Sequence, residues 1–462
     1  MTKNLIWIAA LGLATTAACK DDSGLTGDDG PEPDAAPMPD APPGITLVDV
    51  PAGDIATDTT WTKDKVYTLK GYVFVTGGTL TIQAGTIVKG DNGSALTITK
   101  DARIIANGTA AEPIVFTSAQ PTATSGDWGG VVLLGKAPIN VTGGTNPIEG
   151  FAATFGERVR YGGTDTGHNC GTLKYVRIEY AGFALAVDTE LNGLTMGGCG
   201  SATEIDYVQS HLGLDDGIEI FGGSVNVKHL VITQPDDDGL DWDFGWSGKA
   251  QFVIVQQKDG RGDKGFEADN NPNNNDLTPR SSPEIWNATL IGGDGPSTAK
   301  KQGGMHLRRG TAGRINNAVI AYFNQFGADI DGASTRAQFG SALAIKNTYF
   351  MKSTNAAAIW PTNFDVSSGN QNDCDPAPAA PGTNCFDEQL MIGGDVTNHL
   401  DVDAQLGAPK SLTTPNFKPN AGSPVLTGCG SPPGGGFYDT AATYCGAVGT
   451  TDWTAGWTRF PN

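Results

Sequence analysis

One short unit recurs three times between residues 213 and 269, and it constrains the fold more than any other feature of the chain. Asp-Asp-Gly at 215–217 returns at 237–239, 22 residues later, and Gly239 corresponds to Gly265 after a further 26 residues. Apolar and acidic residues alternate after each glycine, as in the run Leu-Asp-Trp-Asp at 240–243. Alternation with a period of two is typical of a β-strand with one buried face. Repetition every twenty-odd residues indicates stacked coils that each add a strand to a common sheet.

Strand-like runs of this kind continue through residues 45–350. Each run has about five to eight residues rich in Val, Ile and Thr and ends at Gly, Asn or Asp. The sequence therefore predicts an all-β protein, a right-handed single-stranded parallel β-helix with capped ends. The pattern is lost at about 141–172, which predicts a long loop inserted into one coil. Residues 351–462 are predicted to be an irregular, disulfide-pinned segment that caps the C-terminal end of the stack, with Trp453, Trp457 and Phe460 packed over it.

Three asparagines mark one position of the later coils. Asn287, Asn317 and Asn347 are spaced by 30 residues and follow similar Ile-x-Asn motifs. Stacked asparagines form amide ladders in coiled β structures. We therefore expect these three amides to stack, each bonding to the next.

The N-terminus has the order of an export signal. Lys3 precedes an apolar run at 5–13, and small residues lead into Cys19. The run resembles a bacterial lipobox, which predicts a lipoprotein signal peptide at 1–18 and a membrane anchor of acyl chains on Cys19. A plain signal peptide with another cleavage site is the alternative. Residues 19–44 are rich in Asp, Pro and Ala, which predicts a disordered tether.

Charge and cysteine content restrict partners and compartment. The formal net charge of −20, from 30 Lys+Arg and 50 Asp+Glu, argues against nucleic-acid partners and suits cation binding. Six cysteines remain beyond Cys19, an even number that indicates disulfides in an exported chain. Zinc binding by these cysteines is the alternative to disulfides. The sequence contains no CxxC motif and no histidine at ligand spacing, which argues against it. Local pairing is the simplest arrangement, namely Cys170–Cys199, Cys374–Cys385 and Cys429–Cys445.

Several motifs carry a resemblance to a known family. They include KGFEADNNPNNN at 264–275, SSPEIWNATLIGG at 281–293 and GAVGTTDWTAGWTRF at 446–460. The chain resembles bacterial exported outer-membrane lipoproteins with a right-handed parallel β-helix of the pectin-lyase-like fold, a leptospiral outer-membrane lipoprotein among them. The resemblance covers roughly 55–460 and implies the fold and a cell-envelope location. Lys20 after the cysteine is similar to the sorting signal of outer-membrane lipoproteins. The family has no established activity, so no catalytic residue is carried over.

Aligning the coils on their glycines produces a column of charged residues. Glu219, Asp241, Glu267, His306 and Asp329 each stand two positions after the repeated glycine. Their neighbours are apolar and are expected to face the core, so the charged side chains are expected to face outward, roughly 4.8 Å apart. Like charges at that spacing destabilise a sheet unless they are compensated. Ca²⁺, the only cofactor suggested, is predicted to bind among Asp216, Glu219, Asp238, Asp241, Asp243, Glu267 and Asp269.

Two other interpretations of this column stay open, and so do two classes of function. The acids also suit a solvated face neutralised by neighbouring cations, or a catalytic cluster. The favoured function is an envelope lipoprotein whose β-helix surface binds a glycan, a cation or a partner protein without catalysis. The alternative is a Ca²⁺-dependent polysaccharide lyase or glycoside hydrolase acting on acidic glycans, because acids about 7 Å apart on one strand fit a hydrolase. The candidate bases of a lyase are Arg261, Lys264, Arg308 and Arg309.

Overall fold

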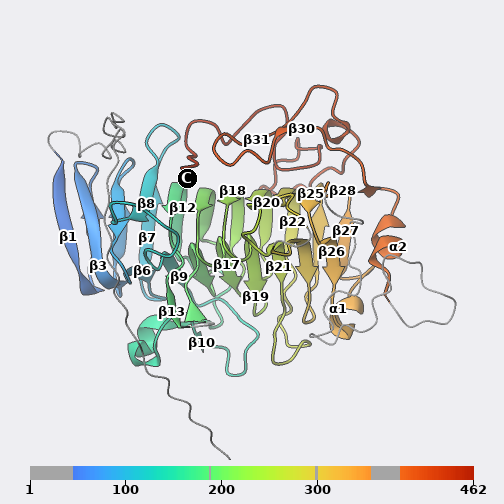
Figure 1. Cartoon of the computed structure of the whole chain (residues 1–462). Helices are drawn as coiled ribbons and strands as arrows, with labels where there is room; N and C mark the ends of the chain where they lie inside the picture. Colours follow the sequence, from blue (N-terminus) through green and yellow to red (C-terminus); the bar gives the residue numbers. More distant parts are fainter. Residues whose placement is uncertain (1–44, 187–188, 297–299, 355–385, 462) are drawn as a thin grey trace, which may run out of the picture. The chain divides into compact units, whose positions relative to one another are not determined.

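The structure is a computed structural model that describes residues 45–186, 189–296, 300–354 and 386–461. Residues 45–462 form one compact unit. Most described strands belong to a single sheet of 25 strands whose neighbours pair in parallel (Figure 1). Among the described residues, no helix has the length and apolarity needed to cross a membrane. The signal peptide, Cys19 and the tether lie outside the described residues.

The strands stack in chain order from the N-terminal end of this unit. The first coils contain β1 (Thr46–Ile55), β2 (Thr59–Trp61), β3 (Lys65–Val75), β4 (Thr79–Ile82), β5 (Ile87–Gly90), β6 (Ala95–Ile98), β7 (Arg103–Asn107), β8 (Ile114–Ser118) and β9 (Val131–Leu134). The middle coils contain β12 (Gly171–Glu179), β15 (Leu194–Gly197), β16 (Glu204–His211), β17 (Ile218–Phe221), β18 (Asn226–Thr233), β19 (Leu240–Asp243), β20 (Lys249–Gln256), β21 (Lys264–Ala268), β22 (Glu284–Ile291) and β23 (Gly303–Leu307). The last contain β24 (Gly313–Asn316), β25 (Val319–Phe323), β26 (Phe326–Ile330), α1 (Ala333–Arg336), β27 (Leu343–Lys346), β28 (Tyr349–Lys352) and β29 (His399–Leu400).

Two series of parallel pairs run through the middle of the stack. One follows β16, β18, β20 and β22, and the other follows β15, β17, β19, β21, β23 and β26. Each strand pairs with its equivalent one coil earlier and one coil later, which is the arrangement of a parallel β-helix. The predicted all-β parallel β-helix is confirmed.

Alternate side chains of the repeated unit fill the core, as the period of two requires. Ile220, Trp242 and Phe266 are almost fully buried in one continuous apolar cluster inside the coils. The indole N–H of Trp242 donates to Thr311 Oγ1 at 3.1 Å, so the one polar atom of this large side chain is satisfied.

The repeated glycines mark places where neighbouring coils approach closely. A Cβ added at Gly217 would lie 2.9 Å from the carbonyl oxygen of Gly239 and 2.1 Å from a methyl carbon of Ile232. A Cβ at Gly239 would in turn lie 2.5 Å from the carbonyl oxygen of Gly265. Glycine recurs because the stacked backbones leave no room for a side chain.

The insertion at 141–172 leaves its coil and packs against the outside of the sheet. It contains β10 (Asn146–Pro147), the 3₁₀ segment η1 (Ala153–Val159) and β11 (Arg160–Tyr161), and a short hairpin of β13 (Ala184–Ala186) and β14 (Thr189–Glu190) follows it. Its apolar side chains join a second cluster with sheet residues such as Phe74 and Phe221. The predicted disulfide Cys170–Cys199 forms at its end, with a Cα–Cα distance of 5.7 Å.

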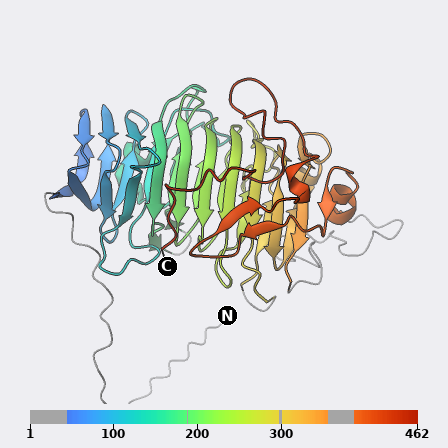
Figure 2. The same ribbon diagram turned by 90° about the horizontal axis from the view of Figure 1, so that it is seen from above.

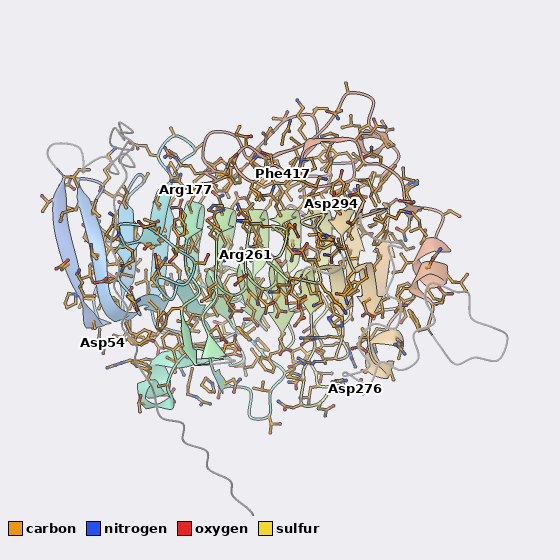
Figure 3. All side chains as sticks on the ribbon, viewed as in Figure 1. Asp54, Arg177, Arg261, Asp276, Asp294 and Phe417 are labelled. Carbon is orange, nitrogen blue, oxygen red and sulfur yellow. A yellow bond between two sulfur atoms is a disulfide. The ribbon has the colours of Figure 1, made fainter. Side chains whose placement is uncertain are left out.

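The C-terminal segment contains α2 (Glu388–Gly393), β30 (Leu406–Ala408), β31 (Asn416–Pro419) and η2 (Pro424–Leu426). Its first described part, with α2 and β29, lies at the C-terminal end of the stack, where β29 pairs with β28 and Ile392 joins the core cluster. From residue 401 onward the segment follows the side of the stack (Figures 1 and 2). Trp457 is only 1% exposed and packs in a cluster with residues of β18, β20 and β22, including Val231, Ile254 and Ile291. Figure 3 labels Arg177 and Phe417 on the covered side. The expected position of Trp453, Trp457 and Phe460 over the C-terminal end is therefore wrong.

Aromatic rings on the side of the stack contact this segment, which explains why Trp453 and Trp457 pack there and not over the C-terminal end. Tyr175, Tyr207 and His229 stack at ring distances of 4.3 and 4.1 Å on three successive coils. Trp453 and Trp457 meet the edges of these rings. Edge-to-face aromatic contacts stabilise beyond the apolar area that they bury.

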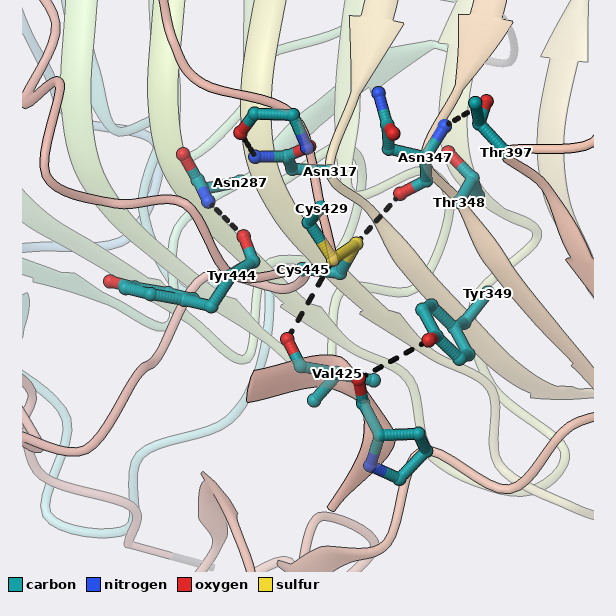
Figure 4. The surroundings of a disulfide bond; sticks show 12 residues. Asn287, Asn317, Asn347, Thr348, Tyr349, Thr397, Val425, Cys429, Tyr444 and Cys445 are labelled. Carbon is teal, nitrogen blue, oxygen red and sulfur yellow. Dashed lines mark hydrogen bonds between the residues drawn. A yellow bond between two sulfur atoms is a disulfide. The ribbon is translucent and has the colours of Figure 1, made fainter. Parts of the chain in front are cut away.

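The second described disulfide lies within the C-terminal segment. Cys429–Cys445 forms as predicted, with a Cα–Cα distance of 5.7 Å (Figure 4). The third predicted pair, Cys374–Cys385, lies outside the described residues.

The asparagine amides near this disulfide bond to the C-terminal segment, so the expected amide-to-amide ladder is wrong. Asn287 donates to the carbonyl of Tyr444 at 2.7 Å and Asn317 donates to that of Gly430 at 2.7 Å. Asn287, Asn317 and Asn347 all adopt left-handed backbone conformations, with φ of 56°, 55° and 51°. Asparagine tolerates that region better than most residues, which accounts for its recurrence.

Candidate functional site

The pairing of β17, β19, β21, β23 and β26 builds the predicted column. Glu219 pairs with Asp241, Asp241 with Glu267, Glu267 with His306, and His306 with Asp329. The apolar neighbours of these residues lie in the core, so the charged side chains project from the other face of the sheet. The alignment of the coils on their glycines is therefore confirmed residue by residue.

The turns before these strands add a second row of acids. Asp216 Oδ1 accepts a hydrogen bond from the backbone N–H of Asp238 at 2.8 Å. Asp238 Oδ1 accepts one from the backbone N–H of Lys264 in the same way. Each turn aspartate is thus oriented by the next coil, and its second oxygen is left for another partner.

Turn and strand acids together form what we call the acidic site. Within each of four overlapping triads, one carboxylate oxygen per residue lies within 4.8 Å of the others. The triads are Asp215/Asp216/Asp237, Asp216/Glu219/Asp241, Asp237/Asp238/Asp263 and Asp238/Asp241/Glu267. Five of the seven predicted ligands are therefore brought together, namely Asp216, Glu219, Asp238, Asp241 and Glu267.

The acidic site is not the solvated face that the outward alternation suggested. Asp216 and Glu219 are each 6% exposed and Asp238 is 4% exposed. Part of the cover comes from Asn192, whose amide donates to Glu219 Oε2 at 2.6 Å. Asp241 Oδ1 is buried and has no hydrogen-bond partner among the described residues. A buried carboxylate without a partner is costly, so this oxygen calls for a proton or a cation.

Burial raises the pKa of most acids in the site. Burial, followed by neighbouring carboxylates, raises the pKa of Asp216, Glu219, Asp238 and Asp241 well above the usual range. Burial and the charge of Asp237 raise the pKa of Asp215 to about 7. Burial and Asp263 raise the pKa of Asp237 to about 6. Several of these groups therefore hold protons at neutral pH unless a cation replaces them.

The other end of the column is already neutralised by basic side chains. Burial opposes ionisation of Glu267, but His306 and Arg308 outweigh it and lower the pKa of Glu267 to about 2. Burial also opposes the charge of His306, yet hydrogen bonds with Asp331 and Glu267 raise its pKa to about 9. The acids at the Asp216 and Glu219 end of the site therefore favour the protonated form, while Glu267 at the other end is ionised and paired with basic side chains.

Two predicted ligands lie outside the triads. Asp269 pairs with Arg308 at 2.8 Å and with Arg309 at 2.7 Å. Asp243 Oδ1 accepts the backbone N–H of Phe244 at 2.5 Å. Both stand four positions after the repeated glycine, at the far end of the strand, while the turn acids lie before its start.

Four acids near the site were not among the predicted ligands. Asp215 and Asp237 belong to the repeated Asp-Asp-Gly motif, and Asp263 stands at the equivalent position, two residues before a repeated glycine. Glu149 belongs to the insertion, and its carboxyl shares a hydrogen bond with Glu219; burial raises the pKa of Glu149. No periodic pattern points to Glu149, because the insertion does not follow the coil repeat.

Three of the four basic residues considered as catalytic bases are held by hydrogen bonds or ion pairs, and the partners of Lys264 and Arg308 include acids of the site itself. Arg261 donates to the backbone carbonyls of Gln234 and Gly213 at 3.1 and 2.7 Å. The ammonium of Lys264 is buried and lies 2.6 Å from Asp263. Burial opposes the charge of Arg308, but Glu267 and Asp269 raise its pKa further above the usual value. A general base must give up its proton, and this setting holds the proton on Arg308.

Comparison with known proteins identifies the family. A family model described as a pectate-lyase-like β-helix domain matches residues 53–385. No curated protein matches the chain. No solved structure matches it either. The matched range begins in β1, contains the whole acidic site and covers most of the chain. The chain therefore belongs to the family of pectate-lyase-like β-helix domains.

Proposed function

We propose that this protein is a cell-envelope lipoprotein whose β-helix holds Ca²⁺ in the acidic site and binds a glycan or a partner protein without catalysis. One observation carries the cation part of the proposal. Four overlapping carboxylate triads, each with oxygens within 4.8 Å of one another, stand on successive coils of a rigid sheet. A cation that bridges them relieves both the mutual repulsion and the cost of burial.

The donor set favours calcium over other common metals. The triads consist of aspartate and glutamate only, without histidine or cysteine. Hard oxygen donors suit Ca²⁺, which accepts six to eight of them in irregular geometry. Zinc prefers nitrogen and sulfur ligands, and Mg²⁺ usually keeps several waters.

Calorimetric titration with CaCl₂ tests the cation site. We expect Asp241→Asn to weaken calcium binding by about tenfold or more, equivalent to about 1.4 kcal/mol, because Asp241 belongs to two of the triads. The matched control is Asp49→Asn, which changes an exposed aspartate of β1 and should leave the affinity unchanged. Equal affinities of the wild type and Asp241→Asn would contradict the assignment.

The second candidate is a calcium-assisted polysaccharide lyase. It is favoured by the family match and by Arg309, a side chain that is 42% exposed beside the acidic site. The engaged states of Arg261, Lys264 and Arg308 favour binding without catalysis. Incubating the protein with polygalacturonate or alginate and CaCl₂ separates the two candidates. Unsaturated products that disappear in Asp241→Asn would establish the lyase and exclude a purely binding role.

The location is proposed from the N-terminal motif. The small residues before Cys19 support cleavage at this cysteine, its acylation and anchoring to the outer membrane. The two described disulfides suit an oxidising compartment outside the cytoplasm. The intact mass of the membrane-extracted protein should correspond to a chain that begins at Cys19 with added acyl groups. A mature chain with another start, or an unmodified cysteine, would contradict the anchor.

A further inference from the structure

A cavity of about 450 Å³ lies among the first coils, and none of the acids of the acidic site lines it. Its wall comes from the turn between β6 and β7, the start of β4, Lys136 after β9, and the end of the insertion. The volume lies in the range of pockets that hold small organic ligands, roughly 300–1,000 Å³. We call it the basic pocket because three basic residues, Lys100, Arg103 and Lys136, line it beside two acidic ones, Asp101 and Asp165.

The three cations differ in how they are held. Lys100 Nζ lies 2.9 Å from Glu157, and Lys136 Nζ lies 2.6 Å from Asp101. These carboxylates are 77% and 60% exposed, and exposed ion pairs contribute little stability. An incoming anion therefore replaces them at small cost. Arg103 is exposed, and its guanidinium has no ion pair or hydrogen bond within the described part of the chain.

The remaining wall is built before any ligand binds. The carboxylate of Asp165 accepts a hydrogen bond from the backbone N–H of Gly167 at 3.0 Å. The backbone N–H of His168 donates to the backbone carbonyl of Asp165 at 3.0 Å. The neighbouring Cys170–Cys199 disulfide fixes this end of the insertion to the sheet. Burial and the charge of Lys136 lower the pKa of His168, so the imidazole is neutral at pH 7 and the attraction for anions rests on the three cations. A preformed wall reduces the ordering cost of binding.

We propose that the basic pocket binds a phosphate or sulfate ester of a small saccharide. A guanidinium fork matches two oxygens of such a group, and the two ammonium groups supply further charge-assisted hydrogen bonds. The polar wall and the volume leave room for the sugar that carries the ester. With His168 neutral, the three cations exceed the two lining carboxylates of Asp101 and Asp165 by one charge, and Arg103, unpaired within the described residues, supplies that excess on a chain with a net charge of −20.

Calorimetric titration of the full chain with glucose 6-phosphate and glucose 6-sulfate tests this proposal, with glucose as the neutral control. We expect one or both esters to bind and glucose to give no heat. Arg103→Gln should weaken ester binding roughly 10- to 100-fold, the effect of losing a charge-assisted hydrogen bond. The stronger of the two esters identifies the preferred group.

The matched control is Arg314→Gln, an exposed arginine in β24 that lies outside the pocket. It should bind the esters as the wild type does, and both variants should keep the thermal unfolding midpoint of the wild type. The proposal is overturned if neither ester binds the wild type, or if Arg103→Gln and Arg314→Gln bind equally well. Because calcium is absent from this titration, its result is independent of the acidic site.

Discussion

Without divalent cations, the protein is expected to lose thermal stability as the pH rises from about 4 to 8, and calcium is expected to restore it. The pKa of Asp215 is raised to about 7 and that of Asp237 to about 6, both from an ordinary value of 3.8. Between the ordinary and the raised values the folded chain binds more protons than the unfolded chain. Stability then falls as the pH rises through this window, because folding must be accompanied by proton uptake.

Calcium is expected to remove this penalty by binding the ionised carboxylates. At a free concentration of about 100 times its dissociation constant, a bound ion would stabilise the folded chain by about 2.7 kcal/mol. For a chain of this length that corresponds to a rise of the unfolding midpoint of roughly 3 °C. Differential scanning calorimetry in EDTA and in CaCl₂, at matched ionic strength across the pH range, measures both effects.

Repulsion among surface acids also lowers stability as the pH rises. The rise of the unfolding midpoint on adding calcium, here called the calcium increment, distinguishes the acidic site from this general effect. The increment at pH 8 should fall to about half or less in Asp241→Asn and persist in full in Asp49→Asn. An unfolding midpoint in EDTA that stays level or rises with pH would show that the buried acids hold no excess protons. An undiminished increment in Asp241→Asn would place calcium elsewhere.

Removing residues 401–462 is expected to abolish cooperative folding. The side chains of Gln209, Gln256 and Asn287 donate to backbone carbonyls of this segment at 2.6, 2.7 and 2.7 Å. Each such hydrogen bond contributes about 0.5–1.5 kcal/mol net, so losing several of them consumes much of a total stability of roughly 5–15 kcal/mol. The truncation also removes Trp457 and exposes the apolar sheet residues that it covers, Val231, Ile254 and Ile291.

Expression yield, calorimetry and binding of a hydrophobic dye to the truncated chain measure this effect. We expect aggregation, or a product without a cooperative transition that binds the dye strongly. The graded comparison is Trp457→Ala in the full chain, which should stay folded with a loss of about 3–5 kcal/mol. A truncated chain that melts cooperatively within a few degrees of the wild type would show that the segment contributes little to the fold.

The fold and the register of the column could be predicted because they depend on local patterns. Alternation along each strand fixed which face is buried, as Trp242 and Asp241 illustrate. The repeated glycines then aligned the coils, since only glycine fits where one backbone passes over the next. The small sequence separations, 29 residues between Cys170 and Cys199 and 16 between Cys429 and Cys445, made local disulfides the simplest choice.

The features that were missed depend on contacts between distant parts of the chain. The guanidinium of Arg177 donates a hydrogen bond to the carbonyl of Trp457, which lies 280 residues away in the sequence. No periodic pattern in the sequence predicts that contact. The burial of Glu219 involves an insertion outside the repeat, which brings Glu149 to its carboxyl. The pairing of Asp269 with Arg308 and Arg309, by contrast, agrees with the alternative in which neighbouring cations neutralise the acids. Local periodicity therefore locates the acidic site but does not reveal its cover.

The acidic site is expected to exchange protons for calcium. Calcium titration at pH 6 in two buffers with different ionisation enthalpies counts the protons released per bound ion. The raised pKa values of Asp215, Asp237 and their buried neighbours predict a release of roughly one to two protons, because metal binding requires ionised carboxylates. Binding without proton release, or no binding at all, would contradict the account.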